Sequence, residues 1–425
     1  MTLNNESTRK LTGAIELLLE SSSRINEAKP RRYWYPLSLA TYGVEEIVEA
    51  LDSLCSFRTT MWEKTLRFER QFAAYQNCSD GVMVNSGSSA DLLLCFLLTN
   101  PVKPLLQPGD EILIPVVTWP TQIWSAKMAG LKVRFVDVDP QTLNIDLADL
   151  ERKITPATKA LFLVHLMGSP CDMDRIMALA QQHNLLIIED CCESLGAEWD
   201  GVKVGNFGVA ASYSFFFSHH MTTMEGGMVA CSSPEVAEQM KILRAHGWVR
   251  NVDASLYDLQ NYDIDPRYAF VNWGFNVRPT DVQASFGLHQ LQKLPDFNQK
   301  RIELAERFFA FIDQEPHLSR PQVASAKAKP TWFALPLLVA TDAPFSRKQI
   351  VNYLEQKGVE TRPIVAGNIA KHPVAHVFPE FLEDDYVGAN IIHEQGFYLG
   401  LSPFHTTEEI DKLIACIKEF LKSHT

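Results

Sequence analysis

Short apolar runs and segments of helical periodicity alternate between residues 82 and 231. The apolar runs predict strands at Val82–Val84, Glu111–Pro115, Lys132–Val136, Ala160–His165, Leu185–Glu189, Ala211–Phe216 and Met228–Ala230. The segments between them predict helices at Ser88–Leu98, Pro120–Ala129, Leu147–Ile154 and Asp172–His183. Because alternating strands and helices form a mostly parallel sheet covered on both faces, we expect an α/β fold with ligands at the carboxyl ends of the strands.

Both ends of the chain add further elements to this pattern. Amphipathic helices are predicted at Leu11–Ile25 and Val44–Leu54, and a long helical region at Thr280–Gln314, which Pro295 is expected to break or kink. A strand (Phe333–Val339) and helices (Arg347–Lys357 and Thr407–Leu421) then predict a smaller α/β unit. We therefore expect an N-terminal helical extension (1–32), a large domain (33–300) and a small C-terminal domain (301–425).

Composition and charge narrow the class of protein. The chain has 425 residues, 46% of them hydrophobic, and its formal net charge of -12 disfavours nucleic-acid and anionic-membrane partners. The longest apolar runs, such as Leu92–Leu98, are too short to cross a bilayer, and no signal-peptide core is visible, so we expect a cytoplasmic protein. Its eight cysteines are then reduced thiols that remain available to a metal or an iron–sulfur cluster.

Polar residues and an indole at the ends of predicted strands are the first candidates for chemistry. Gly87 and Ser88 open a predicted helix, where N–H groups favour a phosphate, although a serine-capped turn explains them equally well. Asp190 ends an apolar strand and suits a protonated ring nitrogen, a metal or a helix cap. Trp119 follows another strand, where it either stacks on a flat ligand or packs in the core.

The predicted strand Ala211–Phe216, which carries Ser214 and aromatic residues, leads into two adjacent histidines, His219 and His220. Side chains of neighbouring residues diverge, so the two rings make a poor chelating pair, and no metal site is expected. One satisfied and one exposed histidine beside core aromatic residues is the alternative interpretation.

Taken in order, these segments resemble the DegT/DnrJ/EryC1/StrS family of sugar aminotransferases, which use pyridoxal 5′-phosphate. The resemblance extends from about Tyr35 to the C-terminus and rests on the motifs SGSSA, PVVTWPT, LFLVHLMGSPCDM, IIEDCCESLGA, SFFFSHH, TMEGGMV and GFNVRPTDVQASFGLHQL. It implies the aspartate-aminotransferase type of fold (fold type I) and a homodimer with shared active sites. It also implies cofactor contacts from the helix start (Gly87, Ser88), Ser214, the ring-nitrogen partner Asp190, the stacking Trp119, and Asn276 of the neighbouring subunit.

The chain departs from that family where the cofactor is normally attached. The family's lysine follows the strand serine by five positions, but here that position is His219, and no lysine occurs between Lys203 and Lys241. Imidazole forms no Schiff base with an aldehyde, so the cofactor must be held noncovalently. With an unperturbed pKa of about 6.5, histidine is instead suited to moving protons.

Histidine at this position resembles one branch of the family, the nucleotide-sugar 3-dehydratases. Glu193, three residues after Asp190, and the segment 360–368 resemble the same branch, which implies that Glu193 contacts the cofactor and that Arg362 and Asn368 contact the substrate. The implied reaction starts from pyridoxamine 5′-phosphate, whose amine condenses with the sugar's 4-keto group. His219 then moves a proton from the cofactor to the departing C3 hydroxyl.

The positions of the cysteines distinguish two groups within that branch. One group holds an iron–sulfur cluster and needs a reductase, but only Cys192 falls at a ligand position, and residues 246–262 contain no cysteine. We therefore expect no cluster and L-glutamate as amino donor, with 3,6-dideoxysugar biosynthesis for O-antigen or a related glycan as the role. Alternatives are a sugar aminotransferase with a non-lysine proton carrier, a reductase-dependent dehydratase of a CDP sugar, a regulatory relative and a metal-dependent lyase. Whether the nucleotide is GDP or CDP stays open.

Overall fold

A seven-stranded sheet forms the centre of the computed structural model, which describes residues 5–27 and 32–424. The strand order is β1-β9-β8-β5-β4-β2-β3, and only β9 runs antiparallel to its neighbours. The bounds are β1 Asp80–Val84, β9 Gly227–Cys231, β8 Ala210–Ser214, β5 Leu186–Asp190, β4 Thr158–Val164, β2 Glu111–Pro115 and β3 Lys132–Val136. The predicted α/β fold with a mostly parallel sheet is confirmed.

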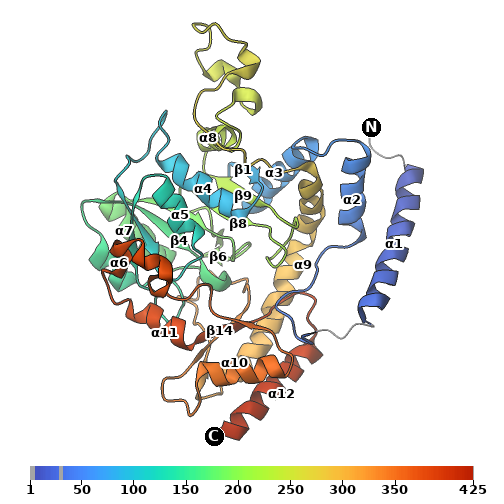
Figure 1. The fold of residues 1–425 in the computed structure, drawn as a ribbon, viewed down its shortest axis with the longest axis vertical. Helices are drawn as coiled ribbons and strands as arrows, with labels where there is room; N and C mark the ends of the chain where they lie inside the picture. The colour runs from blue at the N-terminus through green and yellow to red at the C-terminus, as the bar shows by residue number, and fades with distance from the viewer. Residues whose placement is uncertain (1–4, 28–31, 425) are drawn as a thin grey trace.

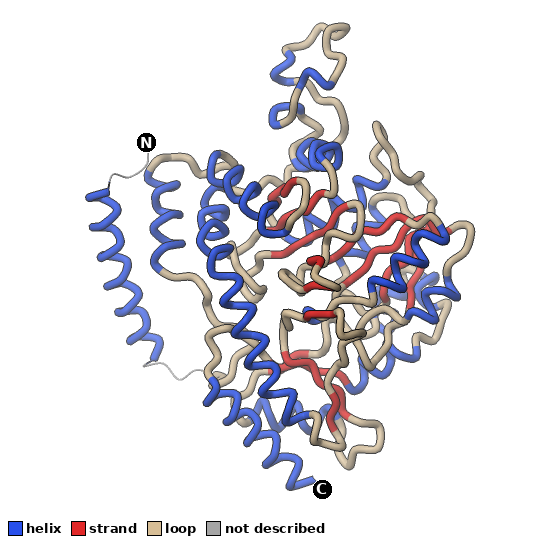
Figure 2. The backbone as a smooth tube through the Cα atoms, turned by 180° about the vertical axis from the view of Figure 1, so that it is seen from behind, coloured by secondary structure: helices blue, strands red, loops and turns tan. Residues whose placement is uncertain are grey.

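Helices flank this sheet, and its strands are fully or largely buried because both faces are covered (Figures 1 and 2). The helices that follow or join the strands are α4 Gly87–Leu98, α5 Thr121–Met128, α6 Leu147–Lys153, α7 Met173–His183 and α8 Pro234–Arg244. In the sheet register, Asp190 pairs with Val164 on one side and with Ser212 on the other. The acidic end of β5 and the serine-bearing end of β8 therefore lie at one edge.

Helix α9 (Asp281–Ile312) runs from the large sheet to the smaller unit, and α2 (Val44–Cys55) and α3 (Glu63–Gln76) pack against it (Figure 1). It begins with a capping box between Thr280 and Gln283. The helix continues through Pro295, so a break there was wrongly expected. Leu294 and Phe297, which flank the proline in the sequence, are both buried in the helix.

A four-stranded antiparallel sheet forms the smaller unit, in the order β10-β12-β14-β13. Its strands are β10 Leu318–Ser319, β12 Leu335–Val339, β14 Gly396–Leu399 and β13 Thr361–Arg362, and they pack with α10 Arg347–Gln356 and α12 Thr407–His424. Three short strands, β6 Glu198–Trp199, β7 Val202–Lys203 and β11 Ala328–Lys329, form a third sheet.

The core of the large unit also takes in residues from the C-terminal third of the chain. Ile364, Ile369, Phe381 and Ile392 belong to the same buried apolar cluster as strands β2 and β4. Helix α11 (Val387–Gln395) lies on this side of the molecule, near α6 (Figure 1). The division into domains at residue 300 stays a prediction.

Two parts of the chain extend from this body. Helix α1 (Asn5–Glu27) lies alongside α2, with Leu17 and Leu18 exposed to solvent (Figures 1 and 2). Residues 248–273, with the short helices η2 Val249–Asn251, η3 Ala254–Leu256 and η4 Pro266–Tyr268, protrude at the opposite end from α12 (Figure 1). No helix within the described ranges is long and apolar enough to cross a membrane.

Candidate functional site

The start of α4 is packed directly against the end of β8. A Cβ atom added to Gly87 would lie 2.6 Å from Cβ of Ser214 and 3.1 Å from Sγ of Cys192, so only glycine fits. Ser86 caps the helix by accepting a hydrogen bond from the N–H of Ser89 at 3.1 Å. The hydroxyl of Ser88 lies 3.1 Å from that of Thr121 at the start of α5. Hydroxyls and a helix N-terminus therefore meet where an anion is favoured.

Asp190, at the end of β5, is buried and held by two donors. Its Oδ1 accepts from the N–H of Cys192 at 2.8 Å, and its Oδ2 accepts from the side-chain amide of Gln122 on α5. Burial raises the pKa of Asp190, and the Cys192 N–H opposes this shift. A carboxylate in such surroundings favours a cationic partner, such as a protonated ring nitrogen.

Trp119 lies just before α5, and its side chain is 60% exposed. No aromatic ring of the described residues packs against its indole. The core alternative for this tryptophan is wrong, because the indole offers a free flat surface near Gln122 and Thr121 at the start of α5.

His219 lies in the loop after β8, half-buried, with its Nδ1 2.7 Å from the carbonyl oxygen of Cys192. A carbonyl only accepts, so Nδ1 carries the proton and Nε2 keeps a basic lone pair. The pKa of His219 is lowered to about 4, chiefly by burial and to a smaller extent by the Arg301 guanidinium, while the hydrogen bond to the Cys192 carbonyl opposes the shift. The neighbouring His220 is buried and points instead to the carbonyl of Thr331. The imidazole of His219 is therefore neutral at pH 7.

Glu193 is connected to His219 through two intervening residues. Its Oε2 accepts from the N–H of Met167 at 2.9 Å, and the carbonyl of Met167 accepts from the N–H of Phe333 at the same distance. The ring of Phe333 lies 5.1 Å from that of His219. Burial raises the pKa of Glu193 to about 7, helped by Asp190 and opposed by the Met167 N–H. The His219 imidazole, with a lowered pKa, and the Glu193 carboxyl, with a raised pKa, are thus connected through Met167 and Phe333.

The predicted substrate contacts differ in their exposure. Arg362, on β13, is half exposed, paired with Glu360 at 2.9 Å and opposite Tyr398 in the sheet register. Asn368 is buried, its Oδ1 accepting from the N–H of Ala370 and its amide donating to Asn390, both at 2.9 Å. Its side chain thus holds its own loop, and its substrate contact stays a prediction, as does that of Arg362.

Asn276, expected to serve the neighbouring subunit, is exposed and accepts from Nε of Arg278 at 3.0 Å. The carbonyl of the adjacent Val277 accepts from the N–H of Asn85, which immediately precedes the α4 cap. This segment therefore lies beside the α4 start of its own chain, and its reach across a dimer stays a prediction.

Sequence reasoning missed several residues of this region. Gln122 follows Trp119 by three positions at a predicted helix start, and that spacing could have revealed it. Met167 lies within the motif LFLVHLMGSPCDM but was not singled out there, and Phe333 and Arg301 lie in no motif, so that only the fold brings these residues to His219. Met167 adopts a left-handed backbone (φ 55°), which is rare for a residue other than glycine.

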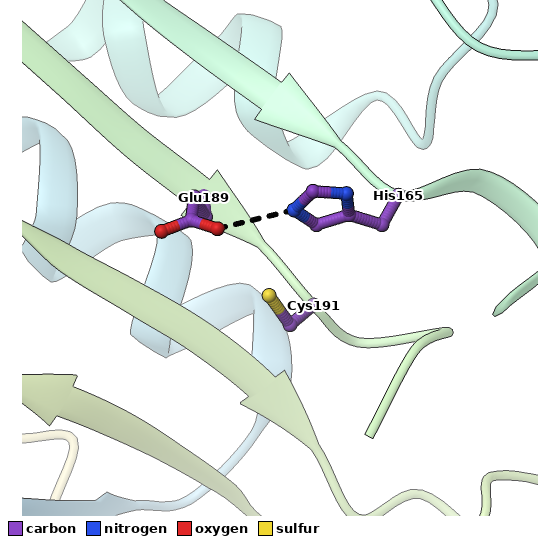
Figure 3. Close-up of side chains that lie close together, drawn as sticks. All are labelled: His165, Glu189 and Cys191. Atoms are coloured by element: carbon purple, nitrogen blue, oxygen red, sulfur yellow. Dashed lines mark hydrogen bonds and ion pairs between the residues drawn. The ribbon is translucent and has the colours of Figure 1, made fainter. Parts of the chain in front are cut away.

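A second buried cluster is formed by His165, Glu189 and Cys191, at the ends of β4 and β5 (Figure 3). Nε2 of His165 lies 3.1 Å from Oε2 of Glu189, and its Nδ1 accepts from the N–H of Cys171. The Glu189 carboxylate also accepts from three backbone N–H groups, those of Gly205, Phe207 and Gly208. The histidine and carboxylate lone pairs are thus already engaged, so the cluster orders the turn at 205–208 rather than offering ligands to a metal.

The DegT/DnrJ/EryC1/StrS aminotransferase family model matches residues 41–418. A GDP-4-keto-6-deoxy-D-mannose 3-dehydratase of Yersinia pseudotuberculosis is 35% identical over 389 residues, which are 91% of this chain and 98% of the relative. The solved E. coli GDP-4-keto-6-deoxy-D-mannose 3-dehydratase with bound hydrated PLP is 34% identical, with a TM-score of 0.85 and coverage of 90% and 99%. A structure of GDP-4-keto-6-deoxymannose-3-dehydratase with a trapped PLP–glutamate geminal diamine has the same identity and coverage and a TM-score of 0.84.

Proposed function

Because the chain belongs to the DegT/DnrJ/EryC1/StrS aminotransferase family, we propose that it is a nucleotide-sugar 3-dehydratase dependent on pyridoxal 5′-phosphate. It removes the C3 hydroxyl of a nucleotide-linked 4-keto-6-deoxy hexose, with L-glutamate as amino donor. The names of the similar proteins favour a GDP-linked substrate, and the glutamate adduct in a solved relative supports the donor. The role would be 3,6-dideoxysugar biosynthesis for O-antigen or a related glycan.

The observation that carries this proposal is the state of His219. It occupies the position of the family's Schiff-base lysine, and its Nδ1–H is committed to the Cys192 carbonyl. The remaining nitrogen, Nε2, is therefore an unprotonated base at neutral pH. A base without a primary amine supports proton transfer in place of covalent cofactor attachment.

The residues present suit noncovalent binding of the cofactor. The close approach at Gly87 leaves the α4 N-terminus, Ser88 and Ser214 available to a phosphate, and a bulkier residue at position 87 would fill this space. Asp190 is a buried acceptor for a protonated pyridine nitrogen, and the exposed indole of Trp119 supplies a stacking face. When bound, the cofactor supplies an amino group and a ring that accepts electrons.

The side chains of the site then have separate roles in binding and proton transfer. The Asp190 carboxylate keeps the proton on the ring nitrogen. Nε2 of His219 would accept a proton from C4′ of the bound cofactor and return it to the oxygen leaving sugar C3, which departs as water. Glu193, with a pKa raised to about 7, can donate or accept a hydrogen bond at the cofactor. Arg362, half exposed on β13, supplies a cation for the anionic part of the substrate.

We also infer that the protein works as a homodimer in the cytoplasm. Exposed apolar side chains, including Phe57 at 92% and Trp62 at 50%, border the segment that carries Asn276, since Thr60 bridges to Thr280. A second subunit on this face would cover them and bring Asn276 to a shared site. All eight cysteines are free, which suits a reducing compartment.

The test is to incubate the purified protein with pyridoxal phosphate, L-glutamate and GDP- or CDP-4-keto-6-deoxy hexose. The proposal requires a nucleotide sugar that has lost one oxygen atom, with matching amounts of 2-oxoglutarate and ammonia. His219→Asn serves as the control and should form this product about 10²- to 10⁴-fold more slowly.

Two other outcomes would identify the alternatives. A product that keeps an amine, with no ammonia released, would indicate an aminotransferase. A protein that is inert with glutamate and active only with a reductase would indicate a reductase-dependent dehydratase.

A further inference from the structure

Arg301 on α9 is a buried cation without a carboxylate partner. Its side chain is 2% exposed, and no carboxylate of the described residues lies within ion-pairing distance of it. The other fully buried arginine, Arg244, is paired with Glu69. Because a buried charge without a counter-ion is costly, Arg301 calls for an explanation other than simple packing.

The hydrogen bonds of Arg301 hold one end of the smaller sheet. Its Nη1 donates to the carbonyl of Phe333 at 3.2 Å and to the carbonyl of Leu401. These residues lie two positions outside the paired residues Leu335 and Leu399, at the same end of β12 and β14. Arg301 therefore clamps the segment that enters β12 to the segment that leaves β14.

Phe333, whose carbonyl is bound by Arg301, places its ring beside His219. Its N–H donates to the carbonyl of Met167 at 2.9 Å, which fixes the residue from its other side. Its ring lies 5.1 Å from the His219 imidazole and inclined to it by 47°. The imidazole of His219 is thus bounded by the Cys192 carbonyl on one side and by Phe333 on another.

The charge of Arg301 acts on the same imidazole. The titratable neighbours of His219 are His220, buried beside it and neutral because burial and Arg301 lower its pKa, and Glu193 and Tyr398 across Phe333. Burial raises the pKa of Tyr398 to about 12, so that group is neutral at pH 7, and raises the pKa of Glu193 to about 7, so that carboxyl is mostly protonated only below pH 7. Arg301 is the cation that disfavours a second positive charge on His219.

We propose that Arg301 is a positioning residue for His219, because it holds Phe333 against the imidazole and so fixes the orientation of that ring. The inference deepens the proposed function and rests on it for the role of His219 as the base. The contacts among Arg301, Phe333 and His219 hold whatever reaction the protein catalyses.

The test is an NMR titration of the imidazoles of the full-length protein, with and without bound pyridoxamine phosphate, in which His219→Asn identifies the His219 signal. Arg301→Gln, which keeps a donor but removes the charge, should raise the pKa of His219 by about half a unit or more. Arg301→Lys, which keeps the charge, should leave that pKa low but weaken the cross-peaks between the Phe333 and His219 rings. Arg307→Gln, an exposed arginine on the same helix paired with Asp411, is the matched control and should change neither.

An unchanged His219 titration in Arg301→Gln, or an equal shift in Arg307→Gln, would overturn the inference. If Arg301→Gln does not fold, Arg301→Lys becomes the deciding variant. A rise of half a unit in the pKa of His219, or cross-peaks between the Phe333 and His219 rings as strong as in the unmodified protein, would then contradict the inference. If His219→Asn kept full dehydration activity, the proposed role of His219 as the base would be wrong, but the effect of Arg301 on the His219 titration would remain valid.

Discussion

Nδ1 of His219 lies 2.7 Å from the carbonyl oxygen of Cys192. Cys192 also donates its N–H to Asp190, so one residue of main chain positions both the carboxylate and the base. The Cys192 thiol also hydrogen-bonds the Asp190 carboxyl and lowers its pKa. The end of β5 therefore sets the distance between the proposed ring-nitrogen partner and the proposed proton carrier.

Replacing His219 by asparagine should lower the dehydration rate by about 10²- to 10⁴-fold, because a positioned general base contributes on that scale. Steady-state product formation, measured by mass spectrometry, checks the rate. Cys192→Ser is the matched control and should retain most activity, since only its main chain bonds His219. Equal losses in the two variants would contradict the assignment.

Replacing His219 by lysine should restore a primary amine at the position that the family uses for covalent attachment. We expect borohydride treatment to fix the cofactor to this variant and to leave the unmodified protein unlabelled. Intact-protein mass spectrometry detects the added mass. Labelling of the unmodified protein at another lysine would contradict noncovalent binding.

Gly87→Ala should weaken cofactor binding about tenfold or more, because its Cβ would approach Ser214 to 2.6 Å and overpacking costs about 1–3 kcal/mol. Fluorescence titration with pyridoxamine phosphate measures the affinity. Gly13→Ala, where a Cβ meets no atom within 4 Å, should bind the cofactor normally.

The raised pKa of Glu193 predicts how stability depends on pH. The pKa of Glu193 is about 7 in the folded chain, against an ordinary value of 4.5, so the folded chain retains this proton to a higher pH than the unfolded chain does. The contribution of this group is therefore complete below pH 4.5 and declines as pH rises toward 7. Glu193→Gln should unfold at a higher temperature than the unmodified protein at pH 8, with the difference shrinking at pH 5. Thermal unfolding of the cofactor-free protein at the two pH values provides the comparison, and an unchanged difference would contradict the raised pKa.

Arg362→Ala and Asn368→Ala should separate substrate binding from loop structure. The first removes an exposed cation and should raise the KM for the nucleotide sugar about tenfold with little change in stability. The second removes hydrogen bonds to Ala370 and Asn390 and should cost about 1–2 kcal/mol of unfolding free energy. Urea unfolding and steady-state kinetics, measured on both variants, distinguish the two roles. A loss of stability in Arg362→Ala together with a raised KM in a stable Asn368→Ala would mean that Asn368 binds the substrate and Arg362 supports the structure.

The sequence predicted the sheet well because each strand of the large unit is a short apolar run between helical segments. It predicted neither α3, whose N-cap Trp62 makes no side-chain capping bond, nor α8. It placed Asp190 at the end of a strand and Gly87 and Ser88 at the start of a helix, which parallel topology brings to one edge, whereas Ser214, predicted inside a strand, is in fact the last residue of β8. Phe333 and Arg301 lie more than 80 residues beyond His219 in the chain, and no local pattern connects them to it.

Residues between 364 and 392 complete the apolar core of the large unit. During synthesis, a ribosome releases the whole central sheet before Ile364, Ile369 and Ile392 emerge. The nascent large unit therefore exposes part of its core until almost the entire chain is made. A fragment that ends near residue 300 would keep that surface exposed and aggregate, so the two parts of this protein mature as one folding unit.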